Sequence, residues 1–312
     1  MKLHHTLSRR EFLDRAALAS ATVALGPFGS SSAWGAEPYS LSVAVFSKVY
    51  QTLKLSFEES AAVTAEAGLD GIDCVARPAG EVLPERATED LPRYAEALRR
   101  RGARMLLLTT GIQSVATPHT ADLLRTAKKL GLRYYRLGQW YHEPGTAPAK
   151  LVSEIKAQLK DVAALNRELG LCAIFQNHSP SGKRTYAGGD LGELRRIVEG
   201  FNPDQIGVAF DIGHALIVNG REWPGHFDAL KPHLKVAYVK DPGRAARFVR
   251  FGEGQVGQTD FFRRLKAAGY ATPLSMHTEF EWADASGAKT RPALVQALKD
   301  SLRVVKAWLA QA

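Results

Sequence analysis

The sequence Phe210-Asp211-Ile212-Gly213-His214-Ala215 completes a short apolar run that is typical of a buried parallel strand. That strand would deliver an acidic side chain, Asp211, and an imidazole, His214, at its carboxyl end, where (β/α)₈ barrels place their chemistry. The alternative interpretation is an aspartate that caps the next helix and a histidine packed in a loop. Two further polar stretches also end predicted strands and favour the functional interpretation: Gln176-Asn177-His178 and His277-Thr278-Glu279.

The same unit recurs eight times after residue 36: a short apolar strand, a polar loop and an amphipathic helix. Ser56 lies three residues before Glu59, the spacing of a capping box at the start of the first helix. No glycine-rich phosphate loop follows the first strand, which disfavours a doubly wound open sheet. We therefore predict an α/β fold with a single closed (β/α)₈ TIM barrel over residues 37–312. Its strands are predicted at 41–46, 71–75, 104–109, 134–137, 172–176, 206–210, 236–239 and 273–279.

The first 36 residues have the features of a targeting segment. Ser8-Arg9-Arg10-Glu11-Phe12-Leu13 resembles the twin-arginine export motif, and small residues precede Glu37. The apolar stretch between them, residues 16–28, is too short and too weakly apolar to span a bilayer. The alternative is a basic amphipathic helix. We expect residues 1–36 to be a twin-arginine signal peptide, the barrel to be periplasmic, and no stable membrane insertion to remain after the signal is removed.

Charge and cysteine content narrow the classes of function. The chain has 312 residues and a formal net charge of +9, and its Lys and Arg residues are dispersed rather than gathered in one run. This distribution predicts no nucleic-acid partner and a mild attraction for anionic substrates or surfaces. The only cysteines, Cys74 and Cys172, fall in different predicted strands. We expect both to be free thiols, because a disulfide needs their Cα atoms within about 7 Å.

The predicted strand ends bring ionisable and amide side chains to one mouth, beside Trp140 and Trp282. Such a mixture is typical of a site for a polyhydroxylated ligand, so we predict a small-molecule carbohydrate as partner. Polar loops alone would account for some of these residues. They do not account for three histidines and three carboxylates on successive strands. The residues expected at the mouth are Ser47, 73–77, Thr110, 139–140, 176–178, 211–214, Lys240-Asp241 and 277–279.

With these stretches the chain resembles the xylose isomerase-like superfamily of barrel enzymes, which includes sugar phosphate isomerases and epimerases and AP-endonuclease-like relatives. The resemblance runs from about residue 41 to the C-terminus. It implies a barrel enzyme that transfers a proton at a carbon next to a carbonyl of a carbohydrate. Besides the strand ends at 176–178, 210–215 and 277–279, it rests on Val239-Lys240-Asp241 and on Gly252-Glu253-Gly254 followed by Asp260-Phe261-Phe262.

The resemblance also implies a divalent ion, Mn²⁺, Mg²⁺, Co²⁺ or Zn²⁺, held by Glu, Asp, His and Glu from strands five to eight. Asp211 and Glu279 match this set, whereas Gln176 replaces the first glutamate and Tyr238 falls at the histidine. An amide oxygen brings no charge, and tyrosine is an uncommon ligand. Two expectations stay open: a metal on Gln176, Asp211 and Glu279 completed by His178 or His214, or a site that has lost its metal.

Roles follow from the chemistry that the resemblance implies. Proton transfer needs a base, an acid and a group that holds the enediolate charge. We predict Glu279 as the base, the metal or Lys240 as the electrophile, and His178 as a further catalytic residue. Asp241 is expected to be structural. The predicted substrate-binding residues are Arg77, Trp140, Asn177, His214, Glu253 and His277. Arg77 and Arg136 would bind a carboxylate or phosphate, or else form surface salt bridges.

Four functions remain open at this point. The first is a sugar isomerase or epimerase, and the second is a sugar lyase or dehydratase on the same scaffold. The third is a non-catalytic carbohydrate-binding barrel, which Gln176 and Tyr238 favour. The fourth, an AP-endonuclease-like phosphodiesterase, would need a richer histidine cluster. Export favours a substrate without phosphate, and the sequence leaves a homo-oligomer open.

Overall fold

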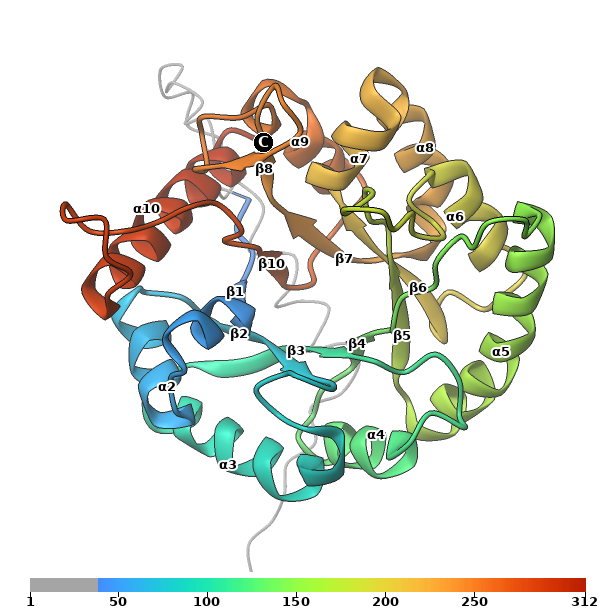
Figure 1. The fold of residues 1–312 in the computed structure, drawn as a ribbon, viewed down its shortest axis with the longest axis horizontal. Helices are drawn as coiled ribbons and strands as arrows, with labels where there is room; N and C mark the ends of the chain where they lie inside the picture. The colour runs from blue at the N-terminus through green and yellow to red at the C-terminus, as the bar shows by residue number, and fades with distance from the viewer. Residues whose placement is uncertain (1–38) are drawn as a thin grey trace, which may run out of the picture. The chain divides into compact units, whose positions relative to one another are not determined.

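The computed structural model describes residues 39–312 (Figure 1). The predicted signal peptide lies outside these residues, so the predicted export stays a prediction. Within the described part, no helix has the length and apolar character that crossing a membrane requires.

The predicted barrel is confirmed, with eight parallel strands that close in the order β1-β10-β7-β6-β5-β4-β3-β2. Closure depends on β1 pairing with β10 on one side and with β2 on the other. All eight predicted strands are present, and the last is shorter than predicted, because residues 277–279 leave the sheet. The strands are β1 (Val43–Phe46), β2 (Gly71–Ala76), β3 (Arg104–Thr110), β4 (Tyr134–Arg136), β5 (Cys172–Gln176), β6 (Ile206–Asp211), β7 (Leu234–Val239) and β10 (Leu274–Met276).

Helices surround the barrel in a ring, and α10 lies beside α2 where the ring closes (Figure 1). Ser56 caps α2 with the predicted capping box, since it accepts from the Glu59 backbone and Glu59 accepts from the Ser56 backbone. The helices are α2 (Phe57–Glu66), α3 (Ala87–Arg100), α4 (Thr120–Lys129), α5 (Pro148–Leu169), α6 (Leu191–Val198), α7 (Ile212–Asn219), α8 (Trp223–Leu230), α9 (Phe261–Ala267) and α10 (Arg291–Ala310).

Two elements near the mouth were not predicted. A 3₁₀ helix, η2 (Ser47–Leu53), directly follows β1, and a short antiparallel hairpin joins β8 (Asp241–Pro242) to β9 (Phe248–Val249). Both lie on the chain immediately after barrel strands. They therefore shape the carboxyl end of the barrel rather than its core.

The barrel strands alternate between two apolar layers. One face packs against the helices, and the other fills the barrel interior with Leu107, Cys172, Ile174, Ala209, Val236 and Tyr238. Because side chains alternate along a strand, the interior face continues upward to Gln176, Asp211 and Lys240. The fold thereby places three polar side chains together above an apolar interior.

Both cysteines are buried free thiols, as predicted. Cys172 belongs to the interior cluster on β5, and Cys74 belongs to the layer that packs against the helices on β2.

Candidate active site

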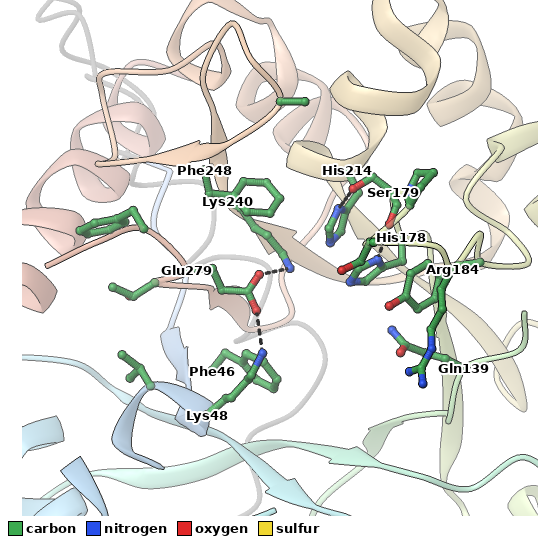
Figure 2. A pocket seen from close by; sticks show the side chains of 18 of the residues that line it. Phe46, Lys48, Gln139, His178, Ser179, Arg184, His214, Lys240, Phe248 and Glu279 are labelled. Atoms are coloured by element: carbon green, nitrogen blue, oxygen red, sulfur yellow. Dashed lines mark hydrogen bonds and ion pairs between the residues drawn. The ribbon is translucent and has the colours of Figure 1, made fainter. Parts of the chain in front are cut away.

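A cavity of about 820 Å³ opens at the carboxyl ends of the strands (Figure 2). Its wall includes Arg77, His178, His214, Lys240 and Glu279, five of the residues that the sequence predicted for the site. These side chains come from β2, β5, β6, β7 and β10 or the loops that follow them. The volume is within the range of small-molecule sites.

The Lys240 ammonium group lies between two carboxylates. Its Nζ is 2.8 Å from Glu279 Oε2 and 3.6 Å from Asp211 Oδ2, and its side chain is only 2% exposed. On the other side of Glu279, the Lys48 Nζ approaches Oε1 at 3.7 Å (Figure 2). Burial alone raises the pKa of Glu279, but Lys240, His277 and Lys48 outweigh it and hold that pKa well below its usual range. Glu279 is therefore an ionised carboxylate at neutral pH.

Asp211 is fixed from several directions. Its Oδ2 accepts a hydrogen bond from Gln176 Nε2 at 2.8 Å, and its Oδ1 accepts one from the His214 backbone at 3.2 Å. Asn177 bonds both the N–H and the C=O of the Asp211 backbone. Asp211 thus caps α7, as the alternative interpretation expected, and also contacts Lys240. Burial raises its pKa to about 6, although Lys240 opposes this.

His178 and His214 form a pair of imidazoles with ring centroids 3.9 Å apart. His178 Nδ1 is 2.7 Å from the Ser179 carbonyl oxygen, so Nδ1 carries the proton and Nε2 is an acceptor. His214 Nδ1 contacts Ser179 Oγ at 2.8 Å. Burial lowers the pKa of His178 to about 3 and that of His214 well below its usual value, and the Lys240 charge acts in the same direction. Both rings are therefore neutral at neutral pH.

Gln176 is held by a buried guanidinium. Arg136 Nη1 donates to Gln176 Oε1 at 2.5 Å, and Arg136 is only 4% exposed. Within residues 39–312, its Nε has no hydrogen-bond partner. The Gln176 amide therefore bridges Arg136 on β4 and Asp211 on β6.

The residues present do not fit the predicted divalent metal. The Gln176 oxygen already accepts from Arg136, and the space between Asp211 and Glu279 holds the Lys240 ammonium. Tyr238, at the position where the resemblance implied a histidine, is fully buried in the interior cluster. In the described part of the chain, no three His, Cys, Asp or Glu side chains are arranged to hold an ion. A fixed cation takes the position that the predicted ion would need.

Four predicted substrate-binding residues lie away from the cavity wall. Trp140 stacks on Phe175 and donates to Gln158 Oε1 at 2.8 Å, so it packs outside the barrel strands. Asn177 is committed to the Asp211 backbone, and His277 is buried against Phe46, with ring centroids 4.3 Å apart. Glu253 is exposed and is not among the residues that line the cavity.

Asp241 has the structural role expected from the sequence. Its carboxylate accepts from the backbone N–H groups of Gly252, Gly254 and Val256 at 2.8 to 3.0 Å. These bonds hold the segment that follows the β8–β9 hairpin. The hairpin in turn places the Phe248 ring 5.2 Å from Lys240 Nζ.

Several residues of the cavity wall were missed by sequence reasoning: Lys48, Tyr141, Arg184, Tyr186, Phe248 and Lys289. All lie in loops or short elements whose course depends on tertiary contacts. The basic stretch Ser181-Gly182-Lys183-Arg184 can be recognised in the sequence. The sequence does not show, however, that this stretch faces the cavity. A β-bridge between Tyr141 and Tyr186 joins this loop to the loop that follows β4, and both tyrosines line the cavity.

The closed parallel barrel and the polar cavity at its carboxyl end define the chain as a (β/α)₈-barrel protein with the site position common to barrel enzymes. More specifically, the chain belongs to the xylose isomerase-like TIM barrel family, whose model matches residues 61–308. No curated protein matches the chain in sequence.

Solved structures share the fold at low identity. The 3-keto-D-glucoside 4-epimerase of E. coli is 12% identical, with a TM-score of 0.63 over 88% of this chain and 100% of that one. The D-psicose 3-epimerase of Clostridium cellulolyticum H10, solved with D-tagatose, is 13% identical, with a TM-score of 0.65 over 86% and 99%. The D-allulose 3-epimerase of Methylomonas sp., solved with D-allulose, is 18% identical, with a TM-score of 0.61 over 86% and 98%.

Proposed function

We propose that this protein is a sugar isomerase or epimerase that transfers a proton at a carbon next to a carbonyl. One observation carries the proposal: a buried ammonium, Lys240, is held against an ionised Glu279 in a cavity that neutral imidazoles also line. A fixed cation, a carboxylate and an imidazole can supply the charge stabiliser, the base and the acid that enolisation requires. The family, and the epimerases named among the structural neighbours, support the same reaction class.

Lys240 would hold the charge of the enediolate. When a proton leaves the carbon, negative charge develops on the carbonyl oxygen, and a preorganised cation in a site of low dielectric stabilises it. Lys240 is suited to this because its ammonium is already fixed by Asp211 and Glu279. The substrate oxygen would replace part of the contact between Lys240 and Glu279. We therefore propose that the reaction uses this ammonium where the family resemblance implied a metal ion.

Glu279 and His178 are the proton-transfer groups of this proposal. Glu279 is a weak base while it is paired with Lys240, because the pairing lowers its pKa. A substrate oxygen that draws Lys240 away raises its basicity at the moment of reaction. His178 presents a neutral imidazole from the opposite side of Lys240 (Figure 2). Two groups on different sides of one carbon would allow epimerisation, and Glu279 alone would allow isomerisation.

A second candidate function rests on the same departures from the family pattern. Gln176 and Tyr238 lack the charge and the ligand type of the residues they replace, and this favours a barrel that binds a carbohydrate without turning it over. The two functions differ in one measurable property. Only the enzyme exchanges a carbon-bound proton of the sugar with solvent.

Solvent exchange tests the proposal. Neutral and anionic sugars, incubated with the protein in D₂O, should incorporate deuterium next to the carbonyl, as read by NMR. Glu279→Gln should lower the exchange rate by about 10²-fold or more, the range of a lost acid–base group. The matched control is Glu168→Gln, an exposed glutamate on α5, which should exchange at the wild-type rate. Sugar binding without exchange in the wild-type protein would instead support the binding barrel.

A further inference from the structure

We propose that the substrate is an anionic sugar, bearing a carboxylate or a phosphate, whose charged group is bound by arginines on the β2–β4 side of the cavity. The proposal deepens the proposed function and rests on it for the reaction class. The charge balance of the cavity wall carries the argument.

Positive charge on the wall far exceeds negative charge. Among the described residues that line the cavity, Glu279 is the one carboxylate, and it pairs with Lys240 and Lys48. Lys289 pairs with Glu281 outside the wall. The arginines that remain have no carboxylate within ion-pair distance in residues 39–312: Arg77, Arg136 and Arg184.

Arg136 gives the strongest indication. It is almost fully buried, yet among the described residues its guanidinium makes one hydrogen bond, to the neutral amide of Gln176, and its Nε has no partner. The guanidinium also lies 5.7 Å from the centroid of the Phe46 ring. Asp73 attracts it only from beyond ion-pair distance. A buried guanidinium without an ion-pair partner is costly, because a more distant carboxylate offsets the desolvation of its charge only in part. A carboxylate or phosphate in the cavity would repay it.

Arg77 and Arg184 extend this region toward solvent. Burial, followed by the nearby Arg136 charge, lowers the pKa of Arg77. Its guanidinium therefore lies close to a like charge, and the Asp73 and Glu279 carboxylates offset this effect only in part. Arg184 stacks over the Tyr141 ring at 5.1 Å, which orients its planar fork. Guanidinium forks match carboxylate and phosphate oxygens in two-point contacts, which a single ammonium does not provide.

The arginines and the reacting groups lie on different sides of the mouth. Arg77 follows β2 and Arg136 ends β4, whereas Lys240 follows β7 and Glu279 follows β10. Figure 2 shows Arg184 across the cavity from Glu279. A sugar that spans the cavity would place its charged group at the arginines and its carbonyl at Lys240. Anion binding is thus a separate role from the charge stabilisation assigned to Lys240.

Calorimetric titration with four probes tests the proposal: D-glucuronate, D-galacturonate, D-glucose 6-phosphate and D-glucose. We expect at least one anionic probe to bind at least tenfold more tightly than D-glucose, with an affinity that falls as salt rises. Arg77→Gln should weaken the binding of that anion tenfold or more and leave the binding of D-glucose unchanged. The anion affinity of Arg77→Lys should lie between those of the wild-type protein and Arg77→Gln. Arg125→Gln, an exposed arginine on α4, is the matched control. The uronates and the phosphate separate the two anion sources.

The outcomes distinguish this inference from the proposed function. D-glucose binding as tightly as every anionic probe would overturn the anionic substrate, and so would an Arg77→Gln variant that weakens neutral and anionic sugars alike. Binding of no probe at millimolar concentration would overturn it as well. Deuterium exchange into a neutral sugar would then still support the proposed function. Tight, salt-sensitive anion binding without any exchange would support the inference and count against the enzyme.

Discussion

At the scale of the single residue, Lys240 changes the chemistry expected of this site. An ammonium carries one positive charge on a flexible side chain, whereas a divalent ion carries two and collects several oxygens. Asp211 and Glu279, which the family resemblance implied as metal ligands, are here the partners of that ammonium. Gln176 is compatible with this arrangement, because an amide can accept from Arg136 and donate to Asp211 at once.

Removing the ammonium should expose a metal site. In Lys240→Ala, Asp211 and Glu279 would face each other without a cation, and breaking such a buried pair costs about 3–5 kcal/mol. We expect the variant to bind Mn²⁺ at least tenfold more tightly than the wild-type protein, as measured by electron paramagnetic resonance. Mn²⁺ should also raise its melting temperature, because a ligand of the folded state stabilises that state. Lys129→Ala on α4 is the control. Equal Mn²⁺ affinity in the wild-type protein and in Lys240→Ala would contradict the replacement.

The residue scale also shows what the sequence could not reveal. Gln176 and Tyr238 were visible departures from the family pattern, so the doubt about the metal followed from the sequence alone. The side chains that surround the expected metal position were harder to predict from the sequence. Arg136 was interpreted as an anion-binding or surface residue, and only the closed barrel shows that its side chain reaches Gln176 from β4. Such a contact depends on strand register and cannot be read from spacing.

At the scale of the element, strands were predicted well and the segments after them poorly. Apolar runs and capping residues are local signals, which is why the β5 range and the Ser56 cap agree with the structure. The β8–β9 hairpin and η2 are fixed by contacts with other parts of the mouth, so no local signal marks them. Glu253 was misplaced for this reason, because its turn is arranged by Asp241 rather than by its own sequence.

Asp241 should be the anchor of the segment after β7. Its buried carboxylate accepts from three backbone N–H groups, and bonds to a charged acceptor contribute more than neutral ones. Asp241→Ala should lower the free energy of unfolding by about 2–4 kcal/mol. It should also reduce turnover, because Phe248 would lose its position beside Lys240. Asp284→Ala is matched, since Asp284 accepts from two backbone N–H groups in an exposed loop. Chemical denaturation should show a larger loss of unfolding free energy in Asp241→Ala than in Asp284→Ala. An equal loss in both variants would rule out the anchoring role.

At the scale of the whole molecule, the sequence predicted the architecture because eight repeated units admit few closed arrangements. Because Cys74 and Cys172 fall in different predicted strands, the sequence also predicted correctly that both are free thiols. The charge pattern of the cavity did not follow from the net charge of +9. Net charge is a sum over the whole chain, whereas the excess of arginine in the cavity depends on which loops converge there.

The stability of the whole barrel should depend on pH through Glu81, which follows β2. Ser47 and Tyr94 donate to its carboxylate, but burial dominates and raises its pKa to about 7, above the ordinary value of 4.5. The folded chain therefore keeps this proton over a range where the unfolded chain has lost it. The stability that the proton contributes is fully present below pH 4.5 and is lost as pH rises through 7.

Replacing Glu81 by Gln should remove this contribution to the pH dependence of stability. The variant carries no titrating group there, so its stability should fall less than that of the wild-type protein between pH 5 and pH 8. The difference should be on the order of 1–2 kcal/mol, because partial exposure of the side chain to water reduces the full effect of the shift. Urea denaturation at pH 5, 6, 7 and 8 measures it. Glu85→Gln, an exposed neighbour in the same segment, should follow the wild-type curve. Parallel curves for wild type and Glu81→Gln would show that Glu81 is ionised in the folded barrel across this range.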